Sequence, residues 1–360
     1  MDANGDLFGV TELGGASNVG TVFEIARTSN GYASTPATLV TFNGSNGAYP
    51  IASLMADANG DLFGTTYGSN LNWGTVFEIP KTNSGYGTLI TLVSFNFDDG
   101  AWPYASLIAD ANGDLFGTTY TGGVFGDGTV FEIAKTTSGY ANTPITLASF
   151  DGIHGLFPDA GLVADTNGNL FGTTWQGGSF NDGTVFEISY DPTTGSYAST
   201  PTILVTFNGK NGENPYGSLI ANANGDLFGT TLQGGGGFGT AFVLAYDSSM
   251  GSYAASPVTL VGFDNKNGAA PETDLIADVN GNLFGTTTAG GANGFGTVFE
   301  LTGSGFVPGR FAGTPETPNC VGMTVSALAQ TYGGVAHAAQ ALGYASVSAL
   351  QSAVATYCSN

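Results

Sequence analysis

One ten-residue stretch, DANGDLFGTT, occurs twice without change, at residues 57–66 and 110–119. The six copies of the motif, exact or near, are spaced 55, 53, 55, 57 and 56 residues apart. A regular period in the fifties is typical of a chain built from repeated supersecondary units, and it limits the fold to a small set of repeat architectures. The four near-copies begin at Asp2, Asp165, Asn222 and Asp278.

One full unit, from Pro103 to Gly152, predicts four strands. PYASLIAD leads into an Asn-Gly turn and DLFGTTY, and a Gly-rich loop then leads to TVFEIAK and, after a further loop, to ITLASF. Each apolar run is rich in β-branched and aromatic residues and is bounded by Gly, Pro, Asn or Asp. No earlier run long enough for a helix shows a 3.6-residue period before Thr324. Each unit is therefore expected to be four antiparallel strands, named A to D in chain order.

A single four-stranded sheet of this size cannot cover both of its faces. Strands such as SLIA and TVFEI are apolar on both sides, so each sheet needs a neighbour on each face. Sheets packed face to face around an axis satisfy this requirement, and a four-stranded repeat of this length matches a β-propeller blade. The sequence predicts an all-β, six-bladed β-propeller over residues 1–313. A β-solenoid, with coils of roughly 20–30 residues, is the less favoured alternative.

The two ends of the repeat region are incomplete. Unit one has no strand A before Asp2, and unit six has no clear strand D after Leu301. The segment GFVPGRFA, residues 305–312, is the candidate for the missing strand D. Open sheet edges recruit other chains. We therefore predict either closure by residues 305–312 or head-to-tail self-association through the incomplete terminal blades.

The composition changes after the repeats. Residues 314–323 are a Pro-rich linker, and residues 324–360 are Ala-rich with apolar residues at helical spacing. Gly-Gly and Gly positions that stop helices divide this segment into three short expected helices. Such a small α-helical C-terminal extension needs a staple. A disulfide between Cys320 and Cys358, which bracket the cluster, would supply one.

The charge and the hydropathy of the chain each argue against one class of partner. There are 28 acidic and only 6 basic residues, a net charge of −22. A nucleic acid needs clustered Lys and Arg, so no nucleic acid is expected as a partner. No stretch approaches the ~18–20 apolar residues of a membrane helix, so no membrane insertion is expected either. The acidic, Lys-poor composition predicts an extracellular or cell-surface protein, although a signal peptide is absent from this chain, which begins in mid-repeat as a trimmed chain would.

The repeat resembles a known family. LIADANGDLFGTTYTGGVFGDGTVFEI is similar to the GloVer (Gloeobacter/Verrucomicrobia) tandem repeat of bacterial secreted and cell-surface proteins, with its L-x-x-D-x-x-G-N/D-L-Y/F-G-T-T motif. The resemblance covers about residues 2–301. It implies a propeller-like extracellular repeat and supplies no catalytic residues.

The repeated motif is also a candidate calcium site. Its alternate Asp, Asn and Asp match the opening of an EF-hand loop, but Leu62 and Gly68 stand where that loop needs Gly and Glu. Asn-Gly between two apolar runs is instead a strong hairpin signal, with Asp side chains bonding local backbone N–H groups. Both readings stay open at this stage, with calcium as the possible cofactor. The candidate ligands are Asp57, Asn59, Asp61, Asp110, Asn112 and Asp114.

Loop aromatics are the candidate ligand-binding residues. Function more often lies where repeats differ, because loops vary without disturbing the core. Aromatic rings beside Asn, Asp and Gly suit stacking on sugar rings, whereas packing between blades is the alternative role. The candidates are Trp73, Phe125, Phe180, Phe238 and Phe295 in the B–C loops, Trp102 with Tyr49 and Phe157 in the D–A loops, and Trp175 at the end of strand B.

No motif of nucleophilic or phosphate chemistry and no His pair for a metal is present. The chain has no G-x-S-x-G elbow and no P-loop, and its two histidines lie far apart. Paired carboxylates, as in glycoside hydrolases, remain available. The leading hypothesis is thus a binding or structural module for a glycan or other neutral ligand; the alternatives are a carboxylate-based glycoside hydrolase or lyase and a self-assembling surface protein. The acids outside the repeat motifs are Glu12, Asp98, Asp99, Asp127, Asp159, Asp182, Glu213, Glu272 and Asp274.

Overall fold

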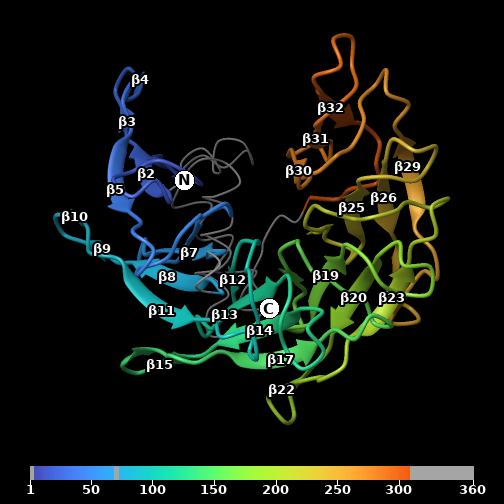
Figure 1. The fold of residues 1–360 in the computed structure, drawn as a ribbon. Coiled ribbons are helices and arrows are strands. Elements are labelled where there is room, and N and C mark those ends of the chain that lie inside the picture. Colours follow the sequence, from blue (N-terminus) through green and yellow to red (C-terminus); the bar gives the residue numbers. More distant parts are fainter. Residues whose placement is uncertain (1–3, 69–72, 309–360) are drawn as a thin grey trace, which may run out of the picture.

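The computed structural model describes residues 4–68 and 73–308, and these form a ring of six antiparallel β-sheets, which confirms the predicted propeller. Figure 1 shows the blades following one another around a central axis, with the first and last blades at the two ends of the ring. Within each complete blade, strand order in the sheet follows strands A to D along the chain. The described residues contain no helix, and so none that could span a membrane.

Blades 2 to 5 have the four strands that the repeat predicts. The innermost strand A has only two residues, whereas strands B, C and D have five each. Blade 2 consists of β6 (Met55–Ala56), β7 (Leu62–Thr66), β8 (Thr75–Ile79) and β11 (Ile90–Ser94), and blade 3 of β12 (Ile108–Ala109), β13 (Leu115–Thr119), β14 (Thr129–Ile133) and β17 (Ile145–Ser149). Blade 4 consists of β18 (Val163–Ala164), β19 (Leu170–Thr174), β20 (Thr184–Ile188) and β23 (Thr202–Thr206), and blade 5 of β24 (Ile220–Ala221), β25 (Leu227–Thr231), β26 (Thr240–Leu244) and β29 (Val258–Gly262).

The terminal blades have three strands each within the described residues. Among these residues blade 1 has no strand A and blade 6 has no strand D, which matches the incomplete ends of the repeat region. Blade 1 consists of β1 (Leu7–Thr11), β2 (Thr21–Ile25) and β5 (Ala37–Thr41), and blade 6 of β30 (Ile276–Ala277), β31 (Leu283–Thr287) and β32 (Thr297–Leu301).

The C–D connections are small hairpins rather than the plain loops that the sequence predicts. Each hairpin ends in a tyrosine, and in blades 2 to 5 this tyrosine packs on a phenylalanine of the preceding blade: Tyr140, for example, contacts Phe63 edge-to-face, with ring centroids 5.5 Å apart. The hairpins therefore clasp neighbouring blades together. They are β3 (Arg27–Thr28) with β4 (Gly31–Tyr32), β9 (Lys81–Thr82) with β10 (Gly85–Tyr86), β15 (Lys135–Thr136) with β16 (Gly139–Tyr140), β21 (Tyr190–Asp191) with β22 (Ser196–Tyr197), and β27 (Tyr246–Asp247) with β28 (Ser252–Tyr253).

The recurring LFGTT and TVFE strings follow from the packing within a blade. In blade 3, the ring of Phe131 lies over Gly117, where a Cβ atom would sit 2.6 Å from the ring. The hydroxyls of Thr119 and Thr129 lie 2.8 Å apart and form a hydrogen bond at the B–C end. Glycine is therefore required in the middle of strand B, and a threonine pair satisfies two polar groups in the buried sheet.

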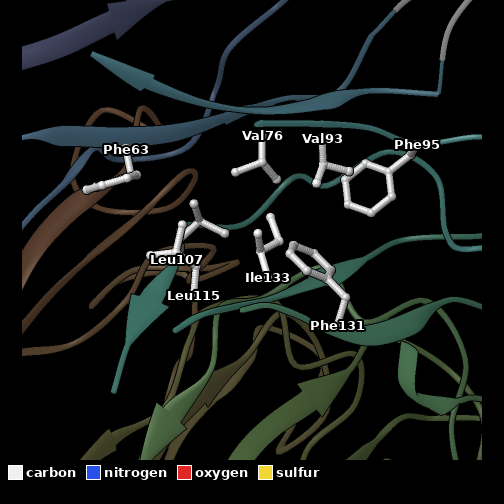
Figure 2. Close-up of a cluster of buried hydrophobic side chains, with 8 residues drawn as sticks. All are labelled: Phe63, Val76, Val93, Phe95, Leu107, Leu115, Phe131 and Ile133. Carbon is white, nitrogen blue, oxygen red and sulfur yellow. The ribbon is translucent and has the colours of Figure 1, made fainter. Parts of the chain in front are cut away.

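The hydrophobic core lies between blades. Figure 2 shows one such layer, in which side chains of blades 2 and 3 meet. Each of these eight side chains is at most 5% exposed, so each internal interface buries several large apolar groups. The same layer recurs between each later pair of blades up to blade 5. Its members are Phe63, Val76, Val93 and Phe95 from blade 2 with Leu107, Leu115, Phe131 and Ile133 from blade 3.

The prediction that residues 305–312 form strand D is wrong for its described part, residues 305–308, which are not a strand. Phe306 instead packs edge-to-face on Phe228 of blade 5, 5.2 Å between centroids. This is the place that the hairpin tyrosines fill on the other blades, so the segment continues the C–D hairpin pattern. The linker at 314–323, the expected helices at 324–360 and the Cys320–Cys358 pair lie outside the described residues.

Candidate functional site

The repeated Asp-Asn-Asp motif forms the A–B turn of each blade. One carboxylate oxygen of Asp57 accepts the N–H groups of Asn59 and Asp61, each at 2.9 Å. Asp61 in turn accepts the N–H of Lys81 at 2.6 Å and ties the turn to the C–D hairpin. Asp110, Asn112 and Asp114 make the same bonds in blade 3. The hairpin interpretation of the motif is thus confirmed.

Calcium at these turns stays a prediction. The Asp side chains already satisfy backbone N–H groups, which is the role expected of them in a tight turn. Within residues 4–68 and 73–308 there is no group of three or more His, Cys, Asp and Glu that could hold a metal ion.

The opposite end of the ring is built from the B–C and D–A loops. One residue of each D–A loop has a left-handed backbone, with φ of 59° at Tyr49, 59° at Trp102 and 61° at Phe157. Such a φ is uncommon for bulky residues and is typical of functional sites. Backbone bonds hold it, since the N–H of Trp102 donates to Trp73 O at 2.8 Å and that of Tyr120 to Trp102 O at 3.0 Å. The equivalent residues of blades 5 and 6 are Asn214 and Ala270.

These loops place a continuous band of aromatic rings across blades 2 to 4. Tyr49 stacks on Tyr67 at 5.3 Å, and Tyr120 stacks on Phe157 at 4.7 Å with the two planes 10° apart. Tyr104 joins the two pairs, because its ring centroid lies 5.2 Å from Tyr67 and 5.3 Å from Tyr120. Aromatic pairs at these separations hold one another in place. The band is therefore a preorganised surface.

The three predicted ligand-binding tryptophans lie beside this band. Trp73 and Trp102 have ring centroids 6.2 Å apart, and Trp102 lies 6.5 Å from Tyr120. Trp175 lies 6.5 Å from Phe157, and its buried indole N–H has no hydrogen-bond partner. A buried donor without a partner is uncommon in a native structure.

A pocket of about 230 Å³ opens where five blades converge on the axis. Its wall is built by the residues that follow the proline of each D–A loop and precede the innermost strand. Tyrosines come from blades 3 and 5, and carboxylates come from blades 4 and 6. The residues directly after the proline are Ile51, Tyr104, Asp159, Tyr216 and Glu272, and two positions further on lie Ser53, Ser106, Gly161, Ser218 and Asp274.

The electrostatics of the pocket centre on Asp159. Burial raises the pKa of Asp159 from 3.8 to about 6, although a hydrogen bond with Tyr216 opposes this shift. Burial and the Asp159 charge together raise the pKa of Tyr216 to about 12. Burial also raises the pKa of Tyr104, with Asp159 as the largest charge acting on it. The pocket therefore holds a carboxyl that changes protonation between pH 5 and 7, next to hydroxyls that stay protonated.

Asp159→Asn is expected to alter the pH dependence of stability. Between pH about 4 and 6 the native state keeps a proton that the unfolded chain has released, so stability falls as pH rises through this window. Asparagine removes that fall. The variant should gain about 1–2 kcal/mol over the wild type at pH 8 and nothing at pH 3.5, a value discounted for partial exposure. Urea unfolding at both pH values measures it.

The matched control is Asp191→Asn. Bonds from Thr193 and Thr194 lower the pKa of Asp191, so its contribution is present above pH about 4 and is lost as pH falls. The control variant should therefore change stability in the opposite direction. Equal pH profiles for the wild type and Asp159→Asn would contradict the buried carboxyl.

The structure separates the residues that the sequence groups as candidates. Asp159, Glu272 and Asp274, three of the acids outside the repeat motifs, are brought together in the pocket, whereas the other six do not line it. The B–C loop aromatics do not line it either. They recur once in each of blades 2 to 6, so they are spread around the ring, with exposed fractions of 37% at Trp73, 61% at Phe125, 62% at Phe180, 38% at Phe238 and 91% at Phe295.

Sequence reasoning missed the tyrosines that make up most of the site. Tyr67 and Tyr120 follow the GTT string, and Tyr104 and Tyr216 follow the D–A proline. The signal was present as the variable residue directly after a recurring proline. Tyr67 also donates to Glu12 at 3.0 Å, and burial with this bond raises its pKa to about 12.

Comparison with protein families gives one match. The sequence profile described as the Gloeobacter/Verrucomicrobia repeat matches residues 1–200 and 145–341, which together span most of the chain. A search of curated proteins gives no match.

Solved structures match this chain at low sequence identity. A candidate 6-phosphogluconolactonase from Bacteroides uniformis is 15% identical with a TM-score of 0.53, over 88% of this chain and 86% of that chain. A luciferin-regenerating enzyme is 12% identical with a TM-score of 0.48, over 86% of this chain and 91% of that chain. An ulvan lyase is 12% identical with a TM-score of 0.46, over 86% of this chain and 81% of that chain. At such identity the first similarity supports the fold alone.

Proposed function

Because the chain belongs to the Gloeobacter/Verrucomicrobia repeat family and its blades converge on one pocket of tyrosines and carboxylates, we propose that it is an extracellular propeller that binds an uncharged glycan there. The observation that carries this proposal is the placement of variable residues on an otherwise repeated scaffold. Tyr104, Asp159 and Glu272 occupy equivalent positions in three blades and line one pocket. A site built from positions where repeats differ is typical of ligand recognition.

The chemistry of the wall favours a polyhydroxyl ligand. Tyrosine rings present flat apolar faces with a polar edge, which suit the two kinds of surface that a sugar ring offers. Ionised carboxylates accept hydrogen bonds from hydroxyl groups, and Asp159, Glu272 and Asp274 supply them. The serines of blades 2, 3 and 5 add small donors and acceptors at the next ring of positions.

Charge disfavours anionic ligands. Among residues 4–68 and 73–308, no Lys or Arg lines the pocket, while three carboxyl groups do. Uronic acids, sulfated sugars and sugar phosphates would bring a like charge into a partly desolvated site, which is destabilising. We therefore expect neutral oligosaccharides to bind and oligogalacturonates to bind much more weakly.

Tyr104→Ala is the direct test of this site. Loss of a central aromatic ring commonly costs about 2 kcal/mol of binding energy, so affinity for the best neutral oligosaccharide should fall roughly 30-fold. Tyr104→Phe, which keeps the ring, should retain most of the affinity. Calorimetric titration of cello-, xylo- and manno-oligosaccharides selected on a glycan array measures both variants.

Phe125→Ala is the matched control on the rim. Phe125 is exposed and has no contact with the pocket wall, so its removal should leave affinity unchanged. If Phe125→Ala weakens binding and Tyr104→Ala does not, the rim aromatics hold the ligand and the pocket proposal fails. Silence of the wild type across broad arrays contradicts the glycan assignment altogether.

A carboxylate-based carbohydrate-active enzyme is the second candidate function. It is favoured by one observation, the occurrence of Asp159, with its pKa raised to about 6, in the same pocket as Glu272 and Asp274. A protonated carboxyl beside an ionised one is the arrangement that glycoside hydrolysis uses, with the first as general acid. If this function holds, the wild type releases reducing ends from a neutral polysaccharide, and Asp159→Asn lowers the rate by at least 10²-fold. Binding without release of reducing ends on the full panel would contradict the enzyme and support the binding module.

A further inference from the structure

The last blade carries an apolar face that no described residue covers. Val298 of β32 is 78% exposed, whereas the equivalent Val76, Val130 and Val185 of blades 2 to 4 are fully buried. Ile276 of β30 is 67% exposed on the same face. In the earlier blades this face packs against the next blade, as Figure 2 shows for Val76. We call the face made by Ile276, Phe284 and Val298 the terminal face.

Two features of the chain bear on what covers it. The described chain ends at the junction of blades 5 and 6, where Ser304 Oγ donates to Gly281 O of blade 6 at 3.1 Å and Ala223 N–H of blade 5 donates to Val307 O at 3.0 Å. Residues 309–360, about one repeat length of chain, follow from that point. The linker at 314–323 can span roughly 30 Å when extended, which is more than the ~10 Å between packed sheets.

Residues 309–360 also need an apolar surface to pack against. Its expected short helices have an apolar stripe that includes Val325, Leu328 and Leu342, and a helical cluster of this size does not supply a stable core alone. The terminal face is an exposed apolar surface of the kind that marks an interaction site. The C-terminal segment lacks an apolar surface to pack against, and the terminal face lacks a cover.

We propose that the C-terminal segment, residues 309–360, docks on the terminal face of blade 6 and takes the place of the missing next blade. The segment then closes the open edge of the last sheet and keeps it from recruiting other chains. This inference does not depend on what the central pocket binds.

A photo-crosslinking residue placed at Val298 in the full chain tests the proposal. The expected result is a crosslink to peptides within residues 309–360 of the same molecule. An equal mixture of ¹⁴N- and ¹⁵N-labelled protein separates crosslinks within one chain from those between chains. Crosslinks between chains, crosslinks to blade 1, or no crosslink above the level of the control would each overturn it. The control is the same residue at Val124, which is 81% exposed in the B–C loop of blade 3.

Hydroxyl-radical footprinting of the unmodified protein gives an independent measurement. Val298 and Val124 are the same residue type with nearly equal exposure in the described ring, so their modification rates should match if nothing covers either. We expect Val298 to be modified at least fivefold more slowly than Val124, at protein concentrations from 1 to 100 μM. Equal rates, or protection of Val298 that disappears on dilution, would overturn the proposal.

Discussion

Replacing Phe186 with alanine is expected to lower the free energy of unfolding by about 3–5 kcal/mol. The Phe186 side chain is fully buried between blades 3 and 4, and its ring lies 5.0 Å from that of Phe150 in an edge-to-face contact. The surrounding strands belong to two different sheets and cannot collapse into the cavity without shifting one blade against the other. Urea unfolding followed by tryptophan fluorescence measures the loss.

Phe180→Ala is the control from the same blade. Phe180 is 62% exposed, so its removal should change stability by less than about 0.5 kcal/mol. Similar losses for the two variants would mean that the interfaces between blades do not carry the stability of the ring.

The second large effect is expected at Gly128. This glycine has a φ of +102°, and a Cβ atom there would lie 2.5 Å from Pro158 Cδ of the next blade and 2.5 Å from the Thr119 carbonyl oxygen. Alanine would therefore add backbone strain of about 1–2 kcal/mol and overlap of about 1–3 kcal/mol. Gly128→Ala should destabilise the protein by about 2–5 kcal/mol and loosen the loop that carries Phe157.

Gly126 separates the two causes. Its φ is +82°, but nothing lies within 4 Å of the Cβ position, so Gly126→Ala adds the backbone strain alone. Its expected cost is about 1–2 kcal/mol. Thermal unfolding of both variants decides; if Gly126→Ala is as damaging as Gly128→Ala, contact with the next blade is not the reason for glycine at position 128.

Local patterns were sufficient to predict the blades. Asn59-Gly60 between apolar runs identifies the A–B turn, and the recurrence of that turn counts six units. The hairpins between strands C and D were missed because their strands have two residues each, too short for any period to show. Tyr140 packs on Phe63 of another blade, 77 positions away in the chain, so no local sequence pattern predicts this contact.

The site was harder to predict. Residues that recur from repeat to repeat are spread around the axis, whereas the pocket is lined by residues that differ between repeats. An aromatic that recurs in the B–C loops of blades 2 to 6, such as Phe125, is distributed around the ring by the symmetry of the fold. Asp159 and Glu272 were identified only as acids outside the repeat motifs, and the sequence has no means of placing them in one pocket. Aligning the residue after each D–A proline would have shown that this position varies in chemistry while the proline before it does not.

The left-handed residues of the D–A loops share one backbone conformation but differ in their side chains. The chain path at Trp102 and Asn214 is set by main-chain bonds to the neighbouring loops, and the same path occurs with tyrosine, tryptophan, phenylalanine, asparagine or alanine. Side chains at this end of the ring can therefore be exchanged while the loop that carries them stays the same. In such a propeller the backbone of these loops is constant, while the side chains at these positions vary. A panel of variants at these five positions would alter the side chains in and beside the aromatic band without redesigning the fold.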